Sequence, residues 1–301
     1  MDSTAIKIKK ALRESGIRTE SEVLGSRLTS FGIGGPVDLL VFPRSEGEVS
    51  EALRLLSDGG IPVYPLGRGT NLLISDRGFR GAMIKTDIQH CRAIRNGLFE
   101  IGAGVRMEEF VETALDAGYA GPEAFGGIPG SIGGGIAMNA GAWDAFIGDF
   151  VDDIVAFDLS GEEIDVIPEG VFDYRKFALR GKSVVASASF SFTEEGNPEH
   201  LIRKAEKFRS RRAKNQPVRE RSAGCVFRNP PGDHAGKIID ELGLKGFSEG
   251  GAVVSEKHAN FIVNRGGASA EDILKLVDEI RNRVRKERNI ELKLEIIKIG
   301  F

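Results

Sequence analysis

Cysteine is scarce in this chain, and its scarcity excludes two kinds of small-protein architecture. Only Cys91 and Cys225 occur among the 301 residues. Two cysteines cannot build a disulfide framework or an all-cysteine zinc cluster. The four histidines are scattered and no HExxH pattern occurs, so the sequence predicts no bound metal.

Long apolar runs are missing as well. Residues 124–143 carry no charge and are long enough to cross a bilayer, but seven of them are glycine. Large apolar side chains are rare in this stretch, so we expect no membrane insertion. The N-terminal residues 1–18 are typical of a short amphipathic helix and lack the apolar core of a signal peptide. The cytoplasm is therefore the expected location.

A strong charge of either sign is absent, because the formal net charge is −3. Such a chain has no general attraction to nucleic acid or to anionic membranes. The local exception is residues 203–221, which hold nine lysines and arginines against two glutamates. A solvated helix face explains most runs of this kind, and an anionic small molecule is the alternative. Phe208 is the one aromatic residue within it, so we expect no nucleic-acid partner.

Three common motifs of nucleotide-binding proteins and hydrolases are also absent. Each GxG pattern lacks the third glycine of GxGxxG, which argues against a Rossmann domain. The sequence RGKS at 180–183 ends like a phosphate-binding P-loop, but Lys176 stands where the leading glycine belongs. Pro129 breaks the GxSxG frame around Ser131, which excludes a nucleophile elbow.

Hydrophobic periodicity predicts strands and helices in alternation along the first half of the chain. Residues 37–42 and 61–67 are typical of strands. Between them lies a helix that Ser45 and Glu48 begin with a capping box and that Gly59-Gly60 ends. A second unit begins with a strand over 98–104, which leads into a helix that ends before Gly118.

The second half continues with a hairpin over 151–167 that turns at Ser160-Gly161. Residues 183–192 predict a strand whose even-numbered residues share one face. A helix capped by Ser269 and Asp272 precedes a final strand over 291–301. We expect three domains, with boundaries at 1–82, 83–200 and 201–301.

Two glycine-rich loops are the strongest functional signal. Glycine lets the backbone approach a ligand closely, and free N–H groups in such a loop can cradle phosphate. Tight turns with a purely structural role are the alternative. Two loops acting on one ligand favour a dinucleotide over a mononucleotide. The candidate binding residues are Gly67, Arg68, Gly69, Thr70, Asn71 and Leu72 in the first loop, and Gly127, Ile128, Pro129, Gly130, Ser131, Gly134, Asn139, Ala140 and Gly141 in the second.

These loops resemble the flavin-binding loops of the vanillyl-alcohol oxidase and p-cresol methylhydroxylase superfamily. Within it, residues 25–301 resemble the UDP-N-acetylenolpyruvoylglucosamine reductase family, in a compact form that lacks an inserted substrate-covering loop. The motifs that carry the resemblance are, in order, SFGIGGPVDLLVFP, PLGRGTNLLISDRGFRG, GGIPGSIGGGIAMNAGAW, DYRKF, RSAGCVFRNP, AGKIIDELGLKG, SEKHANFIVN and LKLEIIKIG. The resemblance implies an α+β fold with a two-part FAD-binding domain of p-cresol methylhydroxylase type and a smaller C-terminal α+β substrate domain.

The resemblance also implies an activity. A flavoenzyme of this family takes hydride from NADPH onto non-covalent FAD. Hydride then passes from flavin N5 to C3 of the enolpyruvyl group of UDP-N-acetylglucosamine enolpyruvate, which gives UDP-N-acetylmuramate for peptidoglycan synthesis and cell-wall biogenesis. The catalytic residues of the family fall on Arg175, Cys225 and Glu295. Asn229, with Arg228 beside it, falls at the substrate-binding position.

The residue types suit this chemistry. Arg175 can hold the substrate carboxylate bidentately as charge develops on it. Cys225, where many family members carry serine, would protonate C2. Glu295 shares a strand face with Ile297 and Ile299, and a partly dry site would raise its pKa.

The chain departs from the family pattern at two places, where Phe177 replaces a serine and Lys293-Leu294 replaces Glu-Pro. Two other functions remain open on the sequence. One is another FAD-dependent oxidoreductase of the same fold that acts on an alcohol, lactone or hydroxy acid. The other is a nucleotide-binding protein without catalytic activity. The preference for NADPH over NADH and the oligomeric state are also left open by the sequence.

Overall fold

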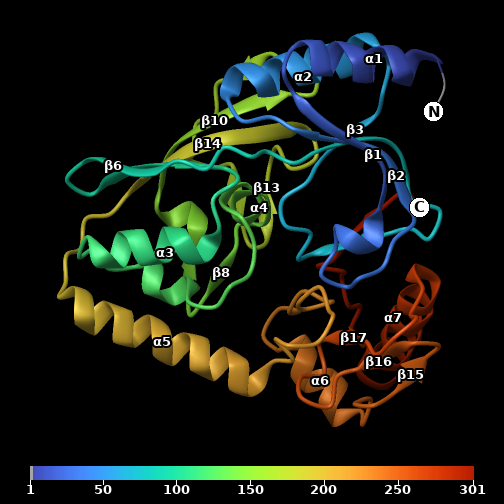
Figure 1. Ribbon diagram of the computed structural model, residues 1–301. Coiled ribbons are helices and arrows are strands. Elements are labelled where there is room, and N and C mark those ends of the chain that lie inside the picture. The colour runs from blue at the N-terminus through green and yellow to red at the C-terminus, as the bar shows by residue number, and fades with distance from the viewer. Residues whose placement is uncertain (1–2) are drawn as a thin grey trace. The chain divides into compact units, whose positions relative to one another are not determined.

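The computed structural model describes residues 3–301 and divides the chain into two compact units (Figure 1). Unit 1 comprises Met1–Glu22, Asp38–Gly67 and Gly81–Ser210, and unit 2 comprises Val23–Val37, Arg68–Arg80 and Arg211–Phe301. The chain passes from one unit to the other between Gly67 and Arg68, inside the first glycine loop.

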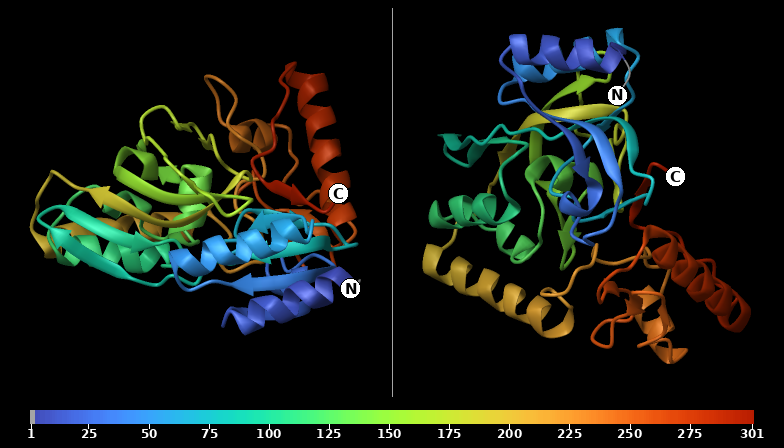
Figure 2. Two further views of the ribbon diagram at one scale, coloured as in Figure 1. Left: turned by 90° about the horizontal axis from the view of Figure 1, so that it is seen from above. Right: turned by 45° about the vertical axis from the view of Figure 1, so that its right-hand side comes forward.

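One layer of unit 1 is a four-stranded sheet covered by two helices. The strand order is β1 (Arg18–Leu24), β2 (Pro36–Phe42), β5 (Phe79–Ile84) and β3 (Val63–Pro65). The helices α1 (Ser3–Glu14) and α2 (Glu46–Asp58) lie side by side (Figure 2).

Helix α2 begins after Ser45 and ends before Gly59 as its sequence predicts, but only one half of the predicted capping box forms. Ser45 is the N-cap, and its hydroxyl accepts a hydrogen bond from the Glu48 backbone N–H. The Glu48 carboxylate reaches back to the N–H of Arg44, one residue before the cap. Gly59 is the C-cap. The buried side chains Val49, Ala52, Leu53 and Leu56 join a core with strands β2 and β5.

The second sheet of unit 1 has five antiparallel strands in the order β11 (Glu163–Ile164), β10 (Val151–Asp158), β14 (Ser183–Ser191), β7 (Leu98–Gly102) and β6 (Cys91–Arg95). Strands β10 and β11 form the predicted hairpin. Helix α3 (Met107–Asp116) packs on this sheet and ends before Gly118, as expected.

Strand β14 differs from its sequence-based prediction because a β-bulge changes its face. Ser187 pairs with Val155, but Val185 already pairs with Ala156, so Ala186 is the extra residue. Ala186 packs into the core under α2, whereas Ala188 packs into the core around α3. The even-numbered residues therefore serve two cores, one on each side of the bulge, rather than the single face that alternation predicted.

The remaining elements of unit 1 carry the second glycine loop and the segments that follow it. They are the 3-10 helices η2 (Pro122–Phe125) and η3 (Ile147–Asp149), the short helix α4 (Ile132–Met138), the hairpins β8–β9 (Gly141–Ala142, Ala145–Phe146) and β12–β13 (Phe172–Asp173, Lys176–Phe177), and the part of helix α5 (Pro198–Asn215) up to Ser210. Helix α5 holds much of the basic run.

Unit 2 has one core of its own. The three-stranded antiparallel sheet β15 (Ser248–Glu249), β16 (Ala252–Val254) and β17 (Ile262–Asn264) packs with helices α6 (Ala235–Glu241) and α7 (Ala270–Arg288). The predicted cap of α7 is confirmed, because Ser269 and Asp272 form a reciprocal capping box. The 3-10 helix η1 (Gly25–Arg27) and strand β4 (Leu72–Ile74) also belong to unit 2.

The C-terminal segment is a strand over a shorter range than the sequence predicts. Only β18 (Ile297–Ile299) is regular, and it pairs in parallel with β4. Before it, Leu294 forms an isolated bridge with Phe227. The segment therefore changes hydrogen-bonding partner between these two pairings, which interrupts a single ladder over 291–301.

A nearly buried carboxylate ties helix α5 to the start of the second glycine loop. Glu123 is 4% exposed, and its oxygens accept hydrogen bonds from the Gly121 N–H at 2.6 Å and from Lys204 Nζ at 2.7 Å. Next to it, a Cβ on Gly126 would lie 2.6 Å from the Ala205 carbonyl oxygen. The glycine loop thus begins in close contact with α5.

We expect Lys204→Met to lower the free energy of unfolding by about 1–3 kcal/mol, because it leaves the Glu123 carboxylate buried without its cation. Lys207→Met, at an exposed position of the same helix, is the control and should change stability little. Chemical denaturation measures both. The double variant Glu123→Gln/Lys204→Met should recover part of the loss; equal stability of the two lysine variants would contradict the assignment.

Within residues 3–301, no helix is both long enough and apolar enough to span a membrane.

Candidate functional site

The first glycine loop, Gly67–Leu72, owes its glycines to close packing. Gly69 has φ +66°, and a Cβ there would overlap the Leu28 carbonyl oxygen. The Gly69 carbonyl accepts a hydrogen bond from the Ser30 N–H at 3.1 Å. Arg68 is exposed, Thr70 and Asn71 are half-buried, and Leu72 is buried as the first residue of β4. The chain 28–30 therefore fixes the path of this loop.

The second glycine loop turns through several positive φ angles before α4. Gly127 and Gly130 have φ +76° and +139°, with Ile128 and Pro129 between them. Ser131 follows as the N-cap of α4, is 3% exposed, and makes no side-chain capping hydrogen bond. After α4, Ala140 and Gly141 lead into the β8–β9 hairpin, where a Cβ on Gly141 would overlap Ala145 and Phe146.

The two loops approach each other at Ser131. A Cβ added to Gly67 would lie 3.0 Å from Ser131 Oγ and 3.4 Å from Gly134 Cα. A serine hydroxyl therefore stands between two backbone segments that carry no side chains. Backbone N–H groups and an uncharged hydroxyl are suited to binding a pyrophosphate, so the residues present fit the phosphate part of a dinucleotide.

The two asparagines of these loops use their amides on neighbouring backbone. Asn71 Nδ2 donates to the Glu295 carbonyl at 3.0 Å. Asn139, which is 5% exposed and has left-handed backbone geometry, donates from Nδ2 to the Asp173 carbonyl at 3.0 Å. Its Oδ1 accepts from the Gly148 N–H at 3.0 Å. Each asparagine thus connects a glycine loop to another segment.

Arg175 lies in the two-residue turn of the β12–β13 hairpin. Its φ is +53°, a region that non-glycine residues rarely adopt and that costs about 1–3 kcal/mol. The strain is held by packing, because Phe177 is 3% exposed and its ring lies 5.3 Å from that of Phe172. Phe177, which stands where the family pattern has a serine, therefore anchors the hairpin in the core.

Cys225 and Glu295 lie on segments of unit 2 that are hydrogen-bonded to each other. The Glu295 N–H donates to the carbonyl of Val226, the residue after Cys225, at 2.8 Å. Cys225 itself forms an isolated bridge with Phe261. Both candidate side chains belong to half-buried residues. The structure thus brings together the segments that carry two of the three predicted catalytic residues, although they lie far apart in the sequence.

The Cys225–Asn229 segment is also bonded to the family departure at 293–294. The Arg228 N–H donates to the Lys293 carbonyl at 2.9 Å. This contact uses backbone atoms, so it does not depend on the side chain at 293. Arg228 Nε is buried without a hydrogen-bond partner among the described residues. Asn229 is exposed, and its Oδ1 accepts from the Ala235 N–H at the start of α6.

Two further residues support these segments, and neither was identified from the sequence. Asn260 is 3% exposed, and its side chain bonds both the N–H and the carbonyl of Phe227 at 2.9 and 2.8 Å. Arg180 Nη1 donates to the Arg175 carbonyl at 3.3 Å. The Arg180 charge also lowers the pKa of Tyr64, although burial raises that pKa by more. No local sequence pattern identifies either residue, because Asn260 bonds a residue 33 positions away and Arg180 bonds the irregular turn of a hairpin.

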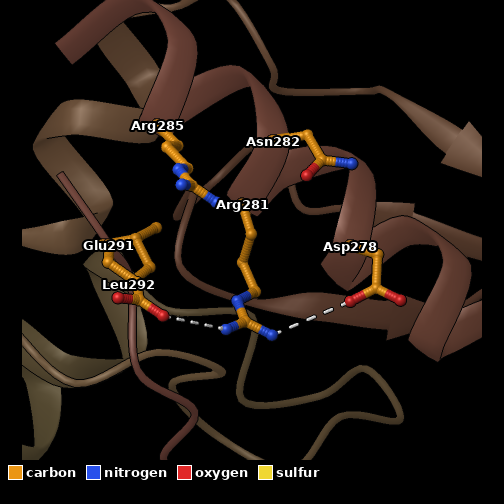
Figure 3. A pocket seen from close by; sticks show the side chains of 6 residues that line it. All are labelled: Asp278, Arg281, Asn282, Arg285, Glu291 and Leu292. Carbon is orange, nitrogen blue, oxygen red and sulfur yellow. Dashed lines mark ion pairs between the residues drawn. The ribbon is translucent and has the colours of Figure 1, made fainter. Parts of the chain in front are cut away.

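A separate hollow lies at the C-terminal half of α7 (Figure 3). Its volume is about 380 Å³, and Arg281 within it forms ion pairs with Asp278 at 3.8 Å and Glu291 at 3.7 Å. None of the predicted site residues lines it. No group of three or more histidine, cysteine, aspartate or glutamate side chains in the described part of the chain could hold a metal ion.

Comparisons with known proteins identify both parts of the chain. Residues 37–166 match the family model of an FAD binding domain, and residues 216–299 match that of the UDP-N-acetylenolpyruvoylglucosamine reductase C-terminal domain. The reductase of Carboxydothermus hydrogenoformans is 38% identical over 100% of both chains. That of Syntrophotalea carbinolica is 40% identical over 91% of this chain and 92% of its own.

A crystal structure of the Thermus caldophilus UDP-N-acetylenolpyruvylglucosamine reductase is similar as well, with a TM-score of 0.81 and 34% identity. The alignment covers 94% of this chain and 100% of that one. The two glycine loops and these matches define an FAD-dependent oxidoreductase. The chain belongs to the UDP-N-acetylenolpyruvoylglucosamine reductase family. The resemblance, the α+β fold class with its FAD-binding and C-terminal domains, and the FAD cofactor predicted from the sequence are thereby confirmed.

Proposed function

We propose that the protein reduces the enolpyruvyl group of UDP-N-acetylglucosamine enolpyruvate with NADPH, which yields UDP-N-acetylmuramate for peptidoglycan precursor synthesis in the cytoplasm. The names of its relatives support the reaction. The structural observation that carries the proposal is the hydrogen bond from the Glu295 N–H to the Val226 carbonyl, which holds the segment of Glu295 against the segment of Cys225. A thiol is an acid that can deliver a proton to carbon, and the Cys225 segment is fixed by this bond.

FAD, when bound, would supply the hydride chemistry that links NADPH to C3 of the substrate. The residues that would hold its phosphates are the two glycine loops, with Ser131 and Thr70 as hydroxyl donors and Gly67, Gly69, Gly130 and Gly134 as points of close backbone approach. We also propose that residues 1–82 and 83–200 form the flavin-binding parts and residues 201–301 the substrate-binding domain.

The proposed catalytic residues act on the substrate carboxylate and on C2. Arg175 binds the carboxylate with its planar guanidinium and stabilises the negative charge that develops there. Cys225 donates a proton from Sγ to C2. Glu295 acts in its protonated form, so it does not repel the negative charge that develops on the substrate carboxylate. Arg228 and Asn229 bind polar groups of the substrate.

The purified protein is expected to carry non-covalent FAD and to be yellow. Anaerobic addition of NADPH should bleach the flavin absorbance, and NADH added separately measures the nicotinamide preference. UDP-N-acetylglucosamine enolpyruvate should then restore the colour, whereas a simple alcohol, lactone or hydroxy acid should not. A colourless protein that takes up no FAD, or reduced flavin that the substrate does not reoxidise, would refute the proposal.

A further inference from the structure

We propose that Asn71 and Asn139 are positioning residues, each of which ties one glycine loop to the segment that carries one proposed catalytic side chain. Asn71 positions Glu295, and Asn139 positions Arg175. This inference rests on the proposed function, because it takes its importance from the roles of Glu295 and Arg175. It assigns the two amides to catalysis of the substrate reaction rather than to binding of the flavin pyrophosphate.

Asn71 is joined to the Glu295 segment at two points. Its side-chain Nδ2 donates to the Glu295 carbonyl, and its backbone carbonyl accepts from the Ile297 N–H, both at 3.0 Å. Directly after it, β4 pairs with β18 in the register Leu72 to Ile297. On the other side of the segment, the Glu295 N–H donates to the Val226 carbonyl at 2.8 Å. The Asn71 amide therefore fixes the Glu295 carbonyl at the point between the bridge of Leu294 to Phe227 and the ladder of β18 with β4.

Asn139 holds the hairpin of Arg175 in a similar way. Its Nδ2 donates to the carbonyl of Asp173, two residues before Arg175, and its Oδ1 is fixed by the Gly148 N–H. Arg180 bonds the Arg175 carbonyl on the other side of the turn. Because Arg175 has positive φ, its turn is strained and depends on such bonds to keep its conformation.

The two bonds have a common chemical form. In each case a side-chain amide N–H from a glycine loop meets a backbone carbonyl near a proposed catalytic residue. An aspartate in the same place keeps the shape and one acceptor oxygen but cannot donate when ionised. It would instead set a carboxylate against a carbonyl oxygen, so the segment must move away. A displacement of about 1 Å at a catalytic group can cost about 10²-fold in rate.

The test uses Asn71→Asp and Asn139→Asp in the full-length FAD-loaded protein, with Asn282→Asp as the matched control at an exposed position of α7. Asn71→Leu and Asn139→Gly remove the donor without adding charge, and glycine tolerates the left-handed backbone at 139. Five quantities are measured. They are the FAD affinity of the apoprotein by fluorescence titration, the melting temperature, the rate of flavin reduction by NADPH, the rate of reoxidation by substrate, and the affinity for UDP-N-acetylmuramate from the flavin spectrum.

For Asn71→Leu we expect reoxidation to slow by about 10- to 100-fold, while FAD affinity, product affinity and reduction by NADPH change by less than about threefold. Asn71→Asp should slow reoxidation at least as much, and a loss of FAD affinity confined to this variant would reflect repulsion between the new carboxylate and the flavin phosphates. For Asn139 variants we expect slower reoxidation together with weaker product binding, because Arg175 is the carboxylate ligand. The control should match the parent in all five quantities.

Two patterns would overturn the inference. One is a loss of FAD affinity in step with slower reduction in the uncharged variants Asn71→Leu and Asn139→Gly, which would make the amides cofactor ligands. The other is unchanged reoxidation in the asparagine variants. Arg175→Lys and Glu295→Gln, measured alongside, distinguish this failure from failure of the proposed function. If those two variants also reoxidise normally, the catalytic roles are wrong; if they alone are slow, only the positioning inference is wrong.

Discussion

Replacing Cys225 with alanine is expected to slow turnover by about 10²–10⁴-fold, which is the usual contribution of a general acid. Flavin binding and reduction by NADPH should persist, because Cys225 is proposed to act only when C2 of the substrate is protonated. Anaerobic stopped-flow measurement of the two half-reactions checks this. Full activity of Cys225→Ala would show that the thiol is a packing residue.

Cys225→Ser should remain active but lose an alkaline limit. A thiol has a pKa of about 8.5 in water and must be protonated to donate, so the wild-type rate should fall as pH rises through the folded-state pKa of the thiol. A hydroxyl stays protonated over this range. The pH profiles of substrate reoxidation for the two proteins should therefore diverge on the alkaline side, and identical profiles would remove Cys225 from the proton-donor role.

Cys91 supplies the control for chemical modification. Burial raises the pKa of Cys91, an effect that the hydrogen bond to Thr113 partly offsets and the nearby Glu109 charge increases. Less thiolate is present on Cys91 at neutral pH, so an alkylating reagent should react with it slowly. In a Cys91→Ala background, alkylation should still inactivate the enzyme and bound substrate should protect it.

Arg175→Lys and Glu295→Gln should each slow reoxidation of the reduced flavin by substrate by about 10²-fold, the scale of losing one donor that stabilises developing charge. Lysine keeps the charge of Arg175 but lacks the planar fork that binds a carboxylate bidentately. Glutamine keeps the shape of Glu295 but cannot supply a proton.

Reduction by NADPH should stay nearly unchanged in both variants, because both residues are proposed to serve the second half-reaction. Arg95→Lys, at an exposed position of β6, is the matched control for the arginine change. Rapid-mixing measurement of each half-reaction decides the outcome. A variant that loses only the NADPH step would contradict the role given to that residue.

Local sequence was sufficient for the elements whose signals lie within a few residues of one another. The caps of α2 and α7 depend on pairs three residues apart, Ser45 with Glu48 and Ser269 with Asp272, and both were predicted. The β10–β11 hairpin was predicted from the Ser160-Gly161 turn. The glycine loops and the family motifs were likewise readable, because glycine patterns and reactive residue types are visible without knowledge of their partners.

Tertiary structure decided what each of these residues contacts. The bulge at Ala186 shifts the face of β14, and Leu294 and Ile297 take different partners within one short segment. Asn71 finds the Glu295 carbonyl 224 residues away, and Asn139 finds that of Asp173. An asparagine amide can bond a phosphate or a carbonyl equally well, so its chemistry alone does not name its partner. Only the folding of distant segments against each other places one acceptor within reach.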